Sequence, residues 1–267
     1  MWSQIFIALG ILGGLGLLFG ALLGIASILF RVDHDARIDQ IVEALPGANC
    51  GGCGYAGCAN FAAEVVAGNA SVGGCPVCNA SQREQIAKIM GQQAASAAKR
   101  KSAMVLCSGT TEAASEKYTY YGIDDCVAAS RLGGGFKQCA YACLGLGTCA
   151  RVCKFDAISV KNGVAVVDAN KCTACGMCVE ACPKHVIELV DVDAKYVVTC
   201  SSRDKGPVVT KACQAGCIGC RLCVKACPVD AITVENNLAR IQYDKCIGCG
   251  TCAQKCPRSI IRLRDQG

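Results

Sequence analysis

The stretch Cys217-Ile-Gly-Cys220-Arg-Leu-Cys223-Val-Lys-Ala-Cys227-Pro228 decides how this chain folds. Its spacing, C-x2-C-x2-C-x3-C-P, occurs twice more, from Cys172 to Pro183 and from Cys246 to Pro257. Three cysteines at this spacing can surround one metal centre from a single loop, and the chain then carries the fourth thiol away on a helix. The pattern indicates a fold organised by metal centres and not by one large apolar core.

An internal repeat of 74 residues contains these runs. Phe155-Asp-Ala-Ile158 matches Val229-Asp-Ala-Ile232 at this offset, and eight cysteines recur with it. The pairs are Cys139 and Cys213, Cys143 and Cys217, Cys149 and Cys223, Cys153 and Cys227, Cys172 and Cys246, Cys175 and Cys249, Cys178 and Cys252, and Cys182 and Cys256. Such constancy predicts a duplicated unit, with copies at 105–195 and 196–267. Short segments such as Val164–Val167 predict small hairpins and an α+β fold.

The repeated run is the one by which bacterial ferredoxins hold [4Fe-4S] clusters, and its fourth cysteine ligates the other cluster of the pair. We therefore expect two tandem ferredoxin-like units with crossed ligands. The four predicted sets are Cys217, Cys220, Cys223 and Cys256; Cys227, Cys246, Cys249 and Cys252; Cys153, Cys172, Cys175 and Cys178; and Cys139, Cys143, Cys149 and Cys182.

The last set departs from the standard run, because Leu146 stands where the repeat has Cys220. We expect Cys139 to supply the missing ligand. Its counterpart Cys213 is then spare, so Cys213→Ala is predicted to leave the iron content unchanged.

A fifth cluster is expected in residues 31–80. The loop Cys50-Gly-Gly-Cys53-Gly-Tyr-Ala-Gly-Cys58 offers three thiolates, and Cys75 closes the set beyond a short helix. Zinc is the alternative, but four-cysteine zinc sites usually come as two separated C-x2-C pairs. Cys78 competes with Cys75 for the fourth position.

Cys107, Cys126 and Cys200 belong to none of these runs. Val105-Leu-Cys107-Ser resembles Val198-Thr-Cys200-Ser at an offset of 93, which indicates a 19-residue insertion in the first unit. These thiols either join Cys213 or Cys78 in a sixth cluster or stay as reduced, partly buried thiols.

Residues 1–30 carry no ionisable side chain and predict a transmembrane anchor. A cleaved signal peptide is the alternative, but the positive segment that should precede the apolar stretch is missing. Arg31 and Arg37 follow the helix, so the remainder is expected on the cytoplasmic side of the inner membrane. The stripe Gly16, Gly20 and Gly24 predicts a helix partner. Residues 81–104, rich in Ala, Gln and Lys, are expected to form a helical linker or a weakly packed surface helix.

Composition limits the function further. The 267 residues include 25 cysteines and carry a formal charge of +6, which thiolate-bound clusters would make negative. The chain has no phosphate-binding glycine loop, and Lys99-Arg100-Lys101 is its longest basic run, so nucleotide and nucleic-acid binding have no support. No flavin or NAD site and no catalytic residue is suggested. We expect a carrier of single electrons.

The uncharged helix, the loop Ala44-Leu-Pro-Gly-Ala-Asn-Cys50-Gly-Gly-Cys53-Gly-Tyr-Ala-Gly-Cys58 and the ferredoxin repeats together resemble the B subunits of Rnf complexes. The resemblance implies an electron-transfer subunit of an ion-translocating ferredoxin:NAD oxidoreductase. Reduced ferredoxin would be its donor, and membrane, flavin-carrying and NAD-binding subunits its partners. Two alternatives stay open: a membrane-tethered polyferredoxin serving another reductase or hydrogenase, and a zinc-structured binding scaffold.

Overall fold

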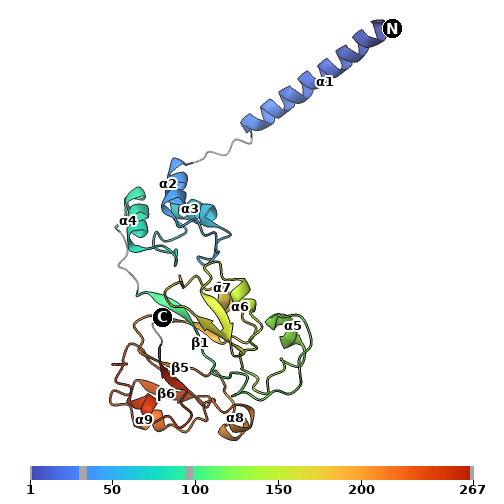
Figure 1. Cartoon of the computed structure of the whole chain (residues 1–267). Coiled ribbons are helices and arrows are strands. Elements are labelled where there is room, and N and C mark those ends of the chain that lie inside the picture. The colour runs from blue at the N-terminus through green and yellow to red at the C-terminus, as the bar shows by residue number, and fades with distance from the viewer. Residues whose placement is uncertain (1, 30–34, 94–98, 265–267) are drawn as a thin grey trace.

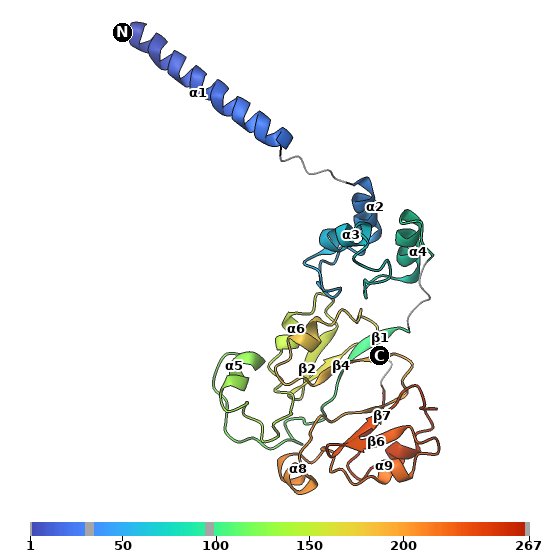
Figure 2. The same cartoon turned by 180° about the vertical axis from the view of Figure 1, so that it is seen from behind.

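The computed structural model describes residues 2–29, 35–93 and 99–264. Figures 1 and 2 show a single helix that stands away from the rest, a small helical bundle, and two units of short helices and strands. This mixture of short elements agrees with the expected α+β class. The cysteine-rich loops lie in the bundle and in the two units.

Helix α1 (Trp2–Leu29) is the apolar N-terminal helix. Among the described helices it is the one long and apolar enough to cross a membrane, with a mean hydropathy of 2.2 over Leu9–Leu29. Its 28 residues extend about 42 Å at about 1.5 Å per residue, more than a hydrocarbon core of roughly 30 Å. Arg31, on which the expected orientation partly rests, lies outside the described residues.

The helical bundle consists of α2 (Ala36–Ala44), α3 (Cys58–Val66) and α4 (Ala80–Ile89). Asp35 caps α2 by accepting a hydrogen bond from the N–H of Arg37 at 2.9 Å. Ile41, Phe61 and Ile86, one from each helix, are at most 2% exposed and form the core.

Helix α4 is part of the bundle, whereas the sequence predicts a linker or a weakly packed surface helix for this segment. Asn79 and Gln82 form a capping box at its start, and Ile86 is fully buried against α2 and α3. The sequence of α4 has few large apolar residues, so only its neighbours reveal that one face is buried.

The two units share one order of elements. The first contains β1 (Lys101–Val105), α5 (Cys126–Arg131), α6 (Thr148–Arg151), β2 (Ile158–Lys161), β3 (Val164–Val167), α7 (Met177–Glu180) and β4 (Ile187–Asp191). The second contains β5 (Tyr196–Val198), α8 (Gly206–Ala212), α9 (Leu222–Lys225), β6 (Ile232–Glu235), β7 (Leu238–Ile241), α10 (Thr251–Gln254) and β8 (Ile261–Leu263). From α6 to β4, each element begins 74 residues before its counterpart.

Each unit is built on two antiparallel strand pairs. In the first unit β1 pairs with β4 and β2 with β3; in the second, β5 pairs with β8 and β6 with β7. The hairpin strand expected at Val164–Val167 is confirmed as β3. Strand β1 begins at Lys101, inside the segment expected to be linker. Its partner β4 lies more than 80 residues further along the chain, so the local sequence does not indicate this strand.

The two units are joined by polar contacts. Ser108 Oγ donates a hydrogen bond to Thr199 Oγ1 at 2.6 Å, and the N–H of Gln214 donates to the carbonyl of Ala113 at 2.7 Å. The buried Arg264, just after β8, reaches the hydroxyl of Ser102 in β1. The units therefore form one body, with a cysteine-rich region between them.

Candidate cluster-binding sites

Site B is a cavity of about 310 Å³ in the first unit, and four thiols line it. They are Cys153, Cys172, Cys175 and Cys178. The N–H of Ala103 in β1 donates a hydrogen bond to Cys172 Sγ at 3.3 Å, a contact that stabilises a thiolate. The structure thus brings together a complete set expected from the sequence.

Site D is the corresponding cavity in the second unit, about 330 Å³ in volume. Its four thiols belong to Cys217, Cys220, Cys223 and Cys256. The loop between the first cysteines turns sharply, with φ of 67° at Gly219 and 61° at Arg221. Cys256 arrives from beyond α10, so this cavity also unites one expected set of crossed ligands.

Site E is the set Cys227, Cys246, Cys249 and Cys252 that is expected from the sequence. Burial raises the pKa of the Cys252 thiol, and the neighbouring Cys246 and Cys249 raise it further. Cys227 Sγ accepts a hydrogen bond from the N–H of Ala231 at 3.3 Å. Cys249 is exposed, so this site reaches the protein surface.

Site C is the set of the first unit for which the structure offers another thiol. The pKa of the Cys149 thiol is raised to about 12. Burial is the largest cause, and the charges of Cys143, Cys126 and Cys182 raise it as well. Cys126 therefore lies among these thiols, whereas Cys139 lines a different cavity, with Cys107, Cys200 and Cys213. We therefore propose Cys126 in place of Cys139, so that site C would consist of Cys126, Cys143, Cys149 and Cys182.

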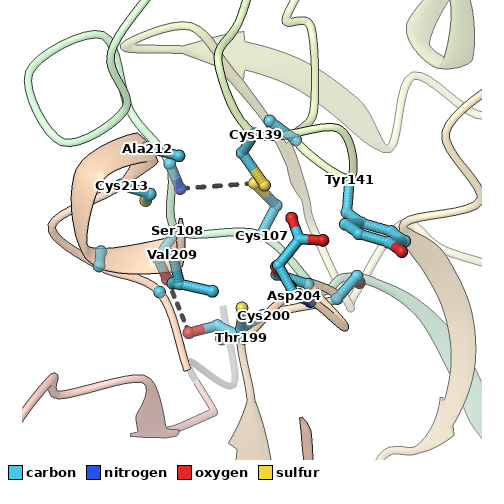
Figure 3. A pocket seen from close by; sticks show the side chains of 16 residues that line it. Cys107, Ser108, Cys139, Tyr141, Thr199, Cys200, Asp204, Val209, Ala212 and Cys213 are labelled. Atoms are coloured by element: carbon cyan, nitrogen blue, oxygen red, sulfur yellow. Dashed lines mark hydrogen bonds between the residues drawn. The ribbon is translucent and has the colours of Figure 1, made fainter. Parts of the chain in front are cut away.

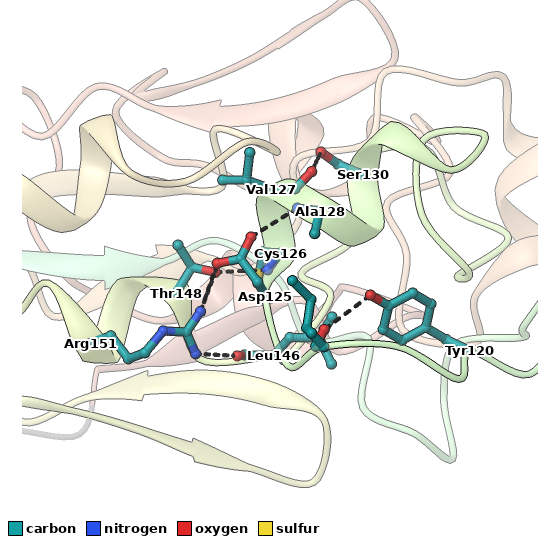
Figure 4. A network of polar contacts seen from close by, with 10 residues as sticks. Tyr120, Asp125, Cys126, Val127, Ala128, Ser130, Leu146, Thr148 and Arg151 are labelled. Carbon is teal, nitrogen blue, oxygen red and sulfur yellow. Dashed lines mark hydrogen bonds and ion pairs between the residues drawn. The ribbon is translucent and has the colours of Figure 1, made fainter.

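The inserted segment of the first unit is what brings Cys126 into place. Asp125 caps α5 by accepting the N–H of Ala128 at 2.8 Å, and it forms an ion pair with Arg151 of α6 at 2.7 Å (Figure 4). Thr148 Oγ1 accepts the N–H of Cys126 at 2.7 Å. These contacts hold α5 against α6, and they place a thiol of the insertion where it could compensate for the cysteine that is missing at Leu146.

Site A is the loop of the helical bundle. Asn49 Oδ1 accepts the N–H of Cys58 at 2.8 Å and thereby shapes the loop that carries Cys50, Cys53 and Cys58. Cys75 and Cys78 are both buried next to it. A hydrogen bond from Cys78 lowers the pKa of the Cys75 thiol. The structure thus brings both candidate fourth thiols close to the loop.

The chemistry of these sites fits iron–sulfur clusters. Buried thiols such as Cys178 and Cys223, whose pKa burial raises to about 11, ionise on binding a metal cation. The Nε–H groups of Arg83 and Arg258, near sites A and D, are buried without a hydrogen-bond partner within the described residues. Cluster sulfur atoms would accept from such donors. Nowhere in residues 2–29, 35–93 and 99–264 do three His, Cys, Asp or Glu side chains converge on a single-ion site.

Three iron–sulfur families match parts of the chain. An Fe-S cluster family matches residues 45–77, a 4Fe-4S binding domain residues 165–188, and a 4Fe-4S dicluster domain residues 216–260. The first match includes Cys75 and ends before Cys78. These matches set aside the zinc scaffold.

Curated relatives match most of the chain. The B subunit of the Na(+)-translocating ferredoxin:NAD(+) oxidoreductase complex of Acetobacterium woodii is 51% identical over 246 residues, which are 92% of this chain and 74% of that protein. The B subunit of the ion-translocating oxidoreductase complex of Methanosarcina acetivorans is 42% identical, over 92% of this chain and 93% of its own. The chain belongs to the family of Rnf B subunits. It is therefore an iron–sulfur electron-transfer subunit of an Rnf-type complex.

A further Rnf relative, the corresponding protein of Clostridium ljungdahlii, carries a name that specifies proton translocation. It is 42% identical over 84% of this chain and 80% of its own. The A. woodii name specifies sodium instead. Both names describe a ferredoxin:NAD(+) oxidoreductase complex, and they differ in the translocated ion.

Cys126 is a candidate ligand that the cysteine runs do not predict. It stands outside every cysteine run, and no local pattern links it to Cys149. The sequence gives one indirect signal of a missing ligand: the run that contains Leu146 has one cysteine fewer than the standard run. That signal could not choose between Cys139 and Cys126.

Proposed function

We propose that this Rnf chain accepts electrons from reduced ferredoxin and passes them to the flavin-carrying, NAD-binding and membrane subunits of its complex. A [4Fe-4S] cluster takes up and gives off one electron at a time. The chain's own contribution is to hold such clusters at sites A to E, at close spacing. The proposed parts are the anchor 2–29, the bundle 36–90 and the ferredoxin-like units 101–191 and 196–263.

The observation that carries the proposal is a series of contacts between successive sites. In site A, the Cα of Gly52 lies against the backbone of Cys175 in site B. Lys154 Nζ also donates a hydrogen bond to the carbonyl of Asn49 at 2.9 Å, which ties the bundle to the first unit. The bundle and the first unit therefore meet where both carry cluster ligands.

Sites within a unit are linked as closely. The charge of Cys178 from site B adds to the raised pKa of Cys149 in site C. In the second unit the fourth ligands cross. Cys227 follows the loop of site D but belongs to site E, and Cys256 follows the loop of site E but belongs to site D. This arrangement supports transfer from one site to the next.

The second unit is the proposed entrance for electrons. It lies at the end of the protein opposite α1 (Figures 1 and 2). Residues 196–264 contain eleven Lys and Arg against four Asp and Glu, so the unit stays basic even with two clusters of about −2 each. Cys220 and Cys249 are exposed, and Ile247 beside Cys249 is 62% exposed. An acidic donor would meet an accessible site here.

Site A is the proposed exit, since the bundle is the part next to α1 (Figure 1). A methyl group on Gly16, Gly20 or Gly24 would meet no atom within 4 Å, which leaves this stripe free for a helix of another subunit. The positive residues after α1 support a cytoplasmic location of the bundle and the units.

The test is anaerobic stopped-flow mixing of the full-length, cluster-loaded chain in detergent with reduced ferredoxin. We expect rapid bleaching of several clusters per chain. Cys58→Ser should not slow this first reduction but should slow onward transfer in the assembled complex. Absence of bleaching in fully loaded protein would refute ferredoxin as the donor, and normal onward transfer in Cys58→Ser would refute site A as the exit.

A further inference from the structure

We propose that the chain binds a sixth four-iron cluster between its two units, held by Cys107, Cys139, Cys200 and Cys213. These four thiols line one cavity (Figure 3). None of them belongs to sites A to E, and none stands in a standard cysteine run. We call this set the bridging site.

The two units supply equivalent halves of the bridging site. Cys139 and Cys213 are counterparts at the 74-residue offset, and Cys107 and Cys200 each follow the first strand of their unit, β1 or β5. Duplication of a unit with two inward-facing thiols creates a four-thiol site where the copies meet. Because each unit contributes only two of the four thiols, a single unit cannot form the site.

The thiols of the bridging site are close together. A methyl group on Gly109 would lie 3.5 Å from Cys107 Sγ and 3.7 Å from Cys213 Sγ. The charges of Cys107 and Cys213 both raise the pKa of the Cys139 thiol, after the larger effect of burial. The space lined by these residues, open solvent included, is about 390 Å³, comparable to about 310 Å³ at site B and about 330 Å³ at site D. Its size and its four cysteines match those of two other cluster sites.

Main-chain donors point at the thiols as they do in site B. Cys107 Sγ accepts N–H groups from Gly109 and Cys143, both at 3.4 Å, and Cys200 Sγ accepts the N–H of Cys217 at 3.3 Å. Cys143 and Cys217 are again counterparts in the repeat. Such N–H···S contacts favour thiolates and are typical of cluster ligands.

A buried cation provides independent evidence for a negative group here. Lys137 is 1% exposed, and its Nζ donates to the carbonyls of Gly109 at 2.7 Å and Gly163 at 2.8 Å. No carboxylate is paired with Lys137 in the part of the chain that the structure describes. Its charge acts on Cys213 and Cys143. A buried charge requires a compensating one, and a four-thiolate cluster supplies about −2.

The bridging site closes the gap between the two units. On one side Cys143 of site C is hydrogen-bonded to Cys107, and on the other Cys217 of site D is hydrogen-bonded to Cys200. The resulting order of sites is E, D, bridging, C, B and A. A one-electron carrier at this place connects the pair of sites in the second unit to the pair in the first.

Zinc is the competing occupant of four cysteines. Tetrahedral zinc with bonds of about 2.3 Å draws its four sulfurs to about 3.8 Å from one another. Within the described residues no three such side chains are placed to hold a single metal ion. A cubane places iron and sulfide between the thiolates and so does not require them to converge on one ion.

The test is metal analysis of the anaerobically reconstituted full-length chain. We expect about 24 irons, little zinc and uptake of about six electrons per chain. Cys200→Ala/Cys213→Ala should lose about four irons and the capacity for about one electron, whereas the sequence alone predicts that Cys213 is spare. Ser108→Ala, which removes a hydrogen bond between the units but no thiol, is the control and should lose neither.

About 20 irons in the wild type with no loss in the double variant, or about one zinc per chain, would overturn the proposal. The wild-type count decides the question even where the double variant does not fold. Because metal content is independent of the donor, failure of ferredoxin to reduce the protein would leave the bridging site standing.

Discussion

The N–H of Cys217 donates a hydrogen bond to Cys200 Sγ at 3.3 Å, and the equivalent N–H of Cys143 donates to Cys107 Sγ at 3.4 Å. Cys217 and Cys143 are proposed ligands of sites D and C, whereas their acceptors are proposed ligands of the bridging site. Each unit thus makes one direct contact between a standard cluster site and the space between the units. This relation predicts that electrons cross from one unit to the other through the bridging site.

The assignment of Cys126 to site C is open to a rescue experiment. Cys126→Ala should lose about four irons per chain, because three thiols remain. Adding Leu146→Cys restores a thiol at the position equivalent to Cys220 and should recover the iron. Iron analysis and low-temperature EPR of the reduced protein measure both effects. Full iron content in the single variant would show that Cys126 is no ligand.

The fourth ligand of site A can be decided between two neighbouring thiols. Cys75→Ala should lose about four irons per chain, whereas Cys78→Ala should keep them, because the matched Fe-S family ends before Cys78. The two variants are controls for each other, since both remove a buried thiol of the same segment. The opposite result would move the ligand to Cys78.

Gly52 should be essential for transfer between sites A and B. A methyl group there would collide with the carbonyl of Cys175, so Gly52→Ala must push the bundle away from the first unit. We expect onward transfer from the first unit to fall about tenfold or more, while iron content stays constant. Gly54→Ala, at φ 86° with open space around it, serves as the control for strain in the same loop. An unchanged rate in Gly52→Ala would place the transfer elsewhere.

Charge reversal should distinguish the two units as docking surfaces. Lys245→Glu/Lys255→Glu changes two exposed lysines near site E and should slow reduction by ferredoxin, most strongly at low ionic strength. Lys161→Glu, on exposed β2 of the first unit, should have little effect. Stopped-flow rates over a series of salt concentrations measure the difference. Equal slowing by both changes would argue against docking at the second unit.

The burial of α4 has a consequence for stability. Ile86→Ala removes a fully buried side chain from the core of the bundle and should cost about 2–5 kcal/mol. The exposed Lys88→Ala on the same helix should cost little. Chemical denaturation followed through the helix signal of the full chain measures both. A small effect of Ile86→Ala would mean that α4 is only loosely attached.

Local spacing alone determined much of the site. Cysteines two or three residues apart in one loop meet at one centre because the chain between them is too short to separate them, and sites B and D gather the thiols expected of them. The 74-residue repeat likewise predicted equal elements, and α6 to β4 recur in order from α9 to β8. The sequence alone likewise predicted the length and the apolar character of α1.

Tertiary structure decided what depends on distant segments. Cys126 lies near Cys149 because contacts such as the Asp125–Arg151 ion pair and the Cys126–Thr148 hydrogen bond hold the insertion against α6. Cys139 and Cys213 face one cavity only because the units meet there. Strand β1 and the buried face of α4 likewise exist through partners far along the chain. Sequence spacing determines contacts within a loop, while contacts between loops depend on how whole elements pack.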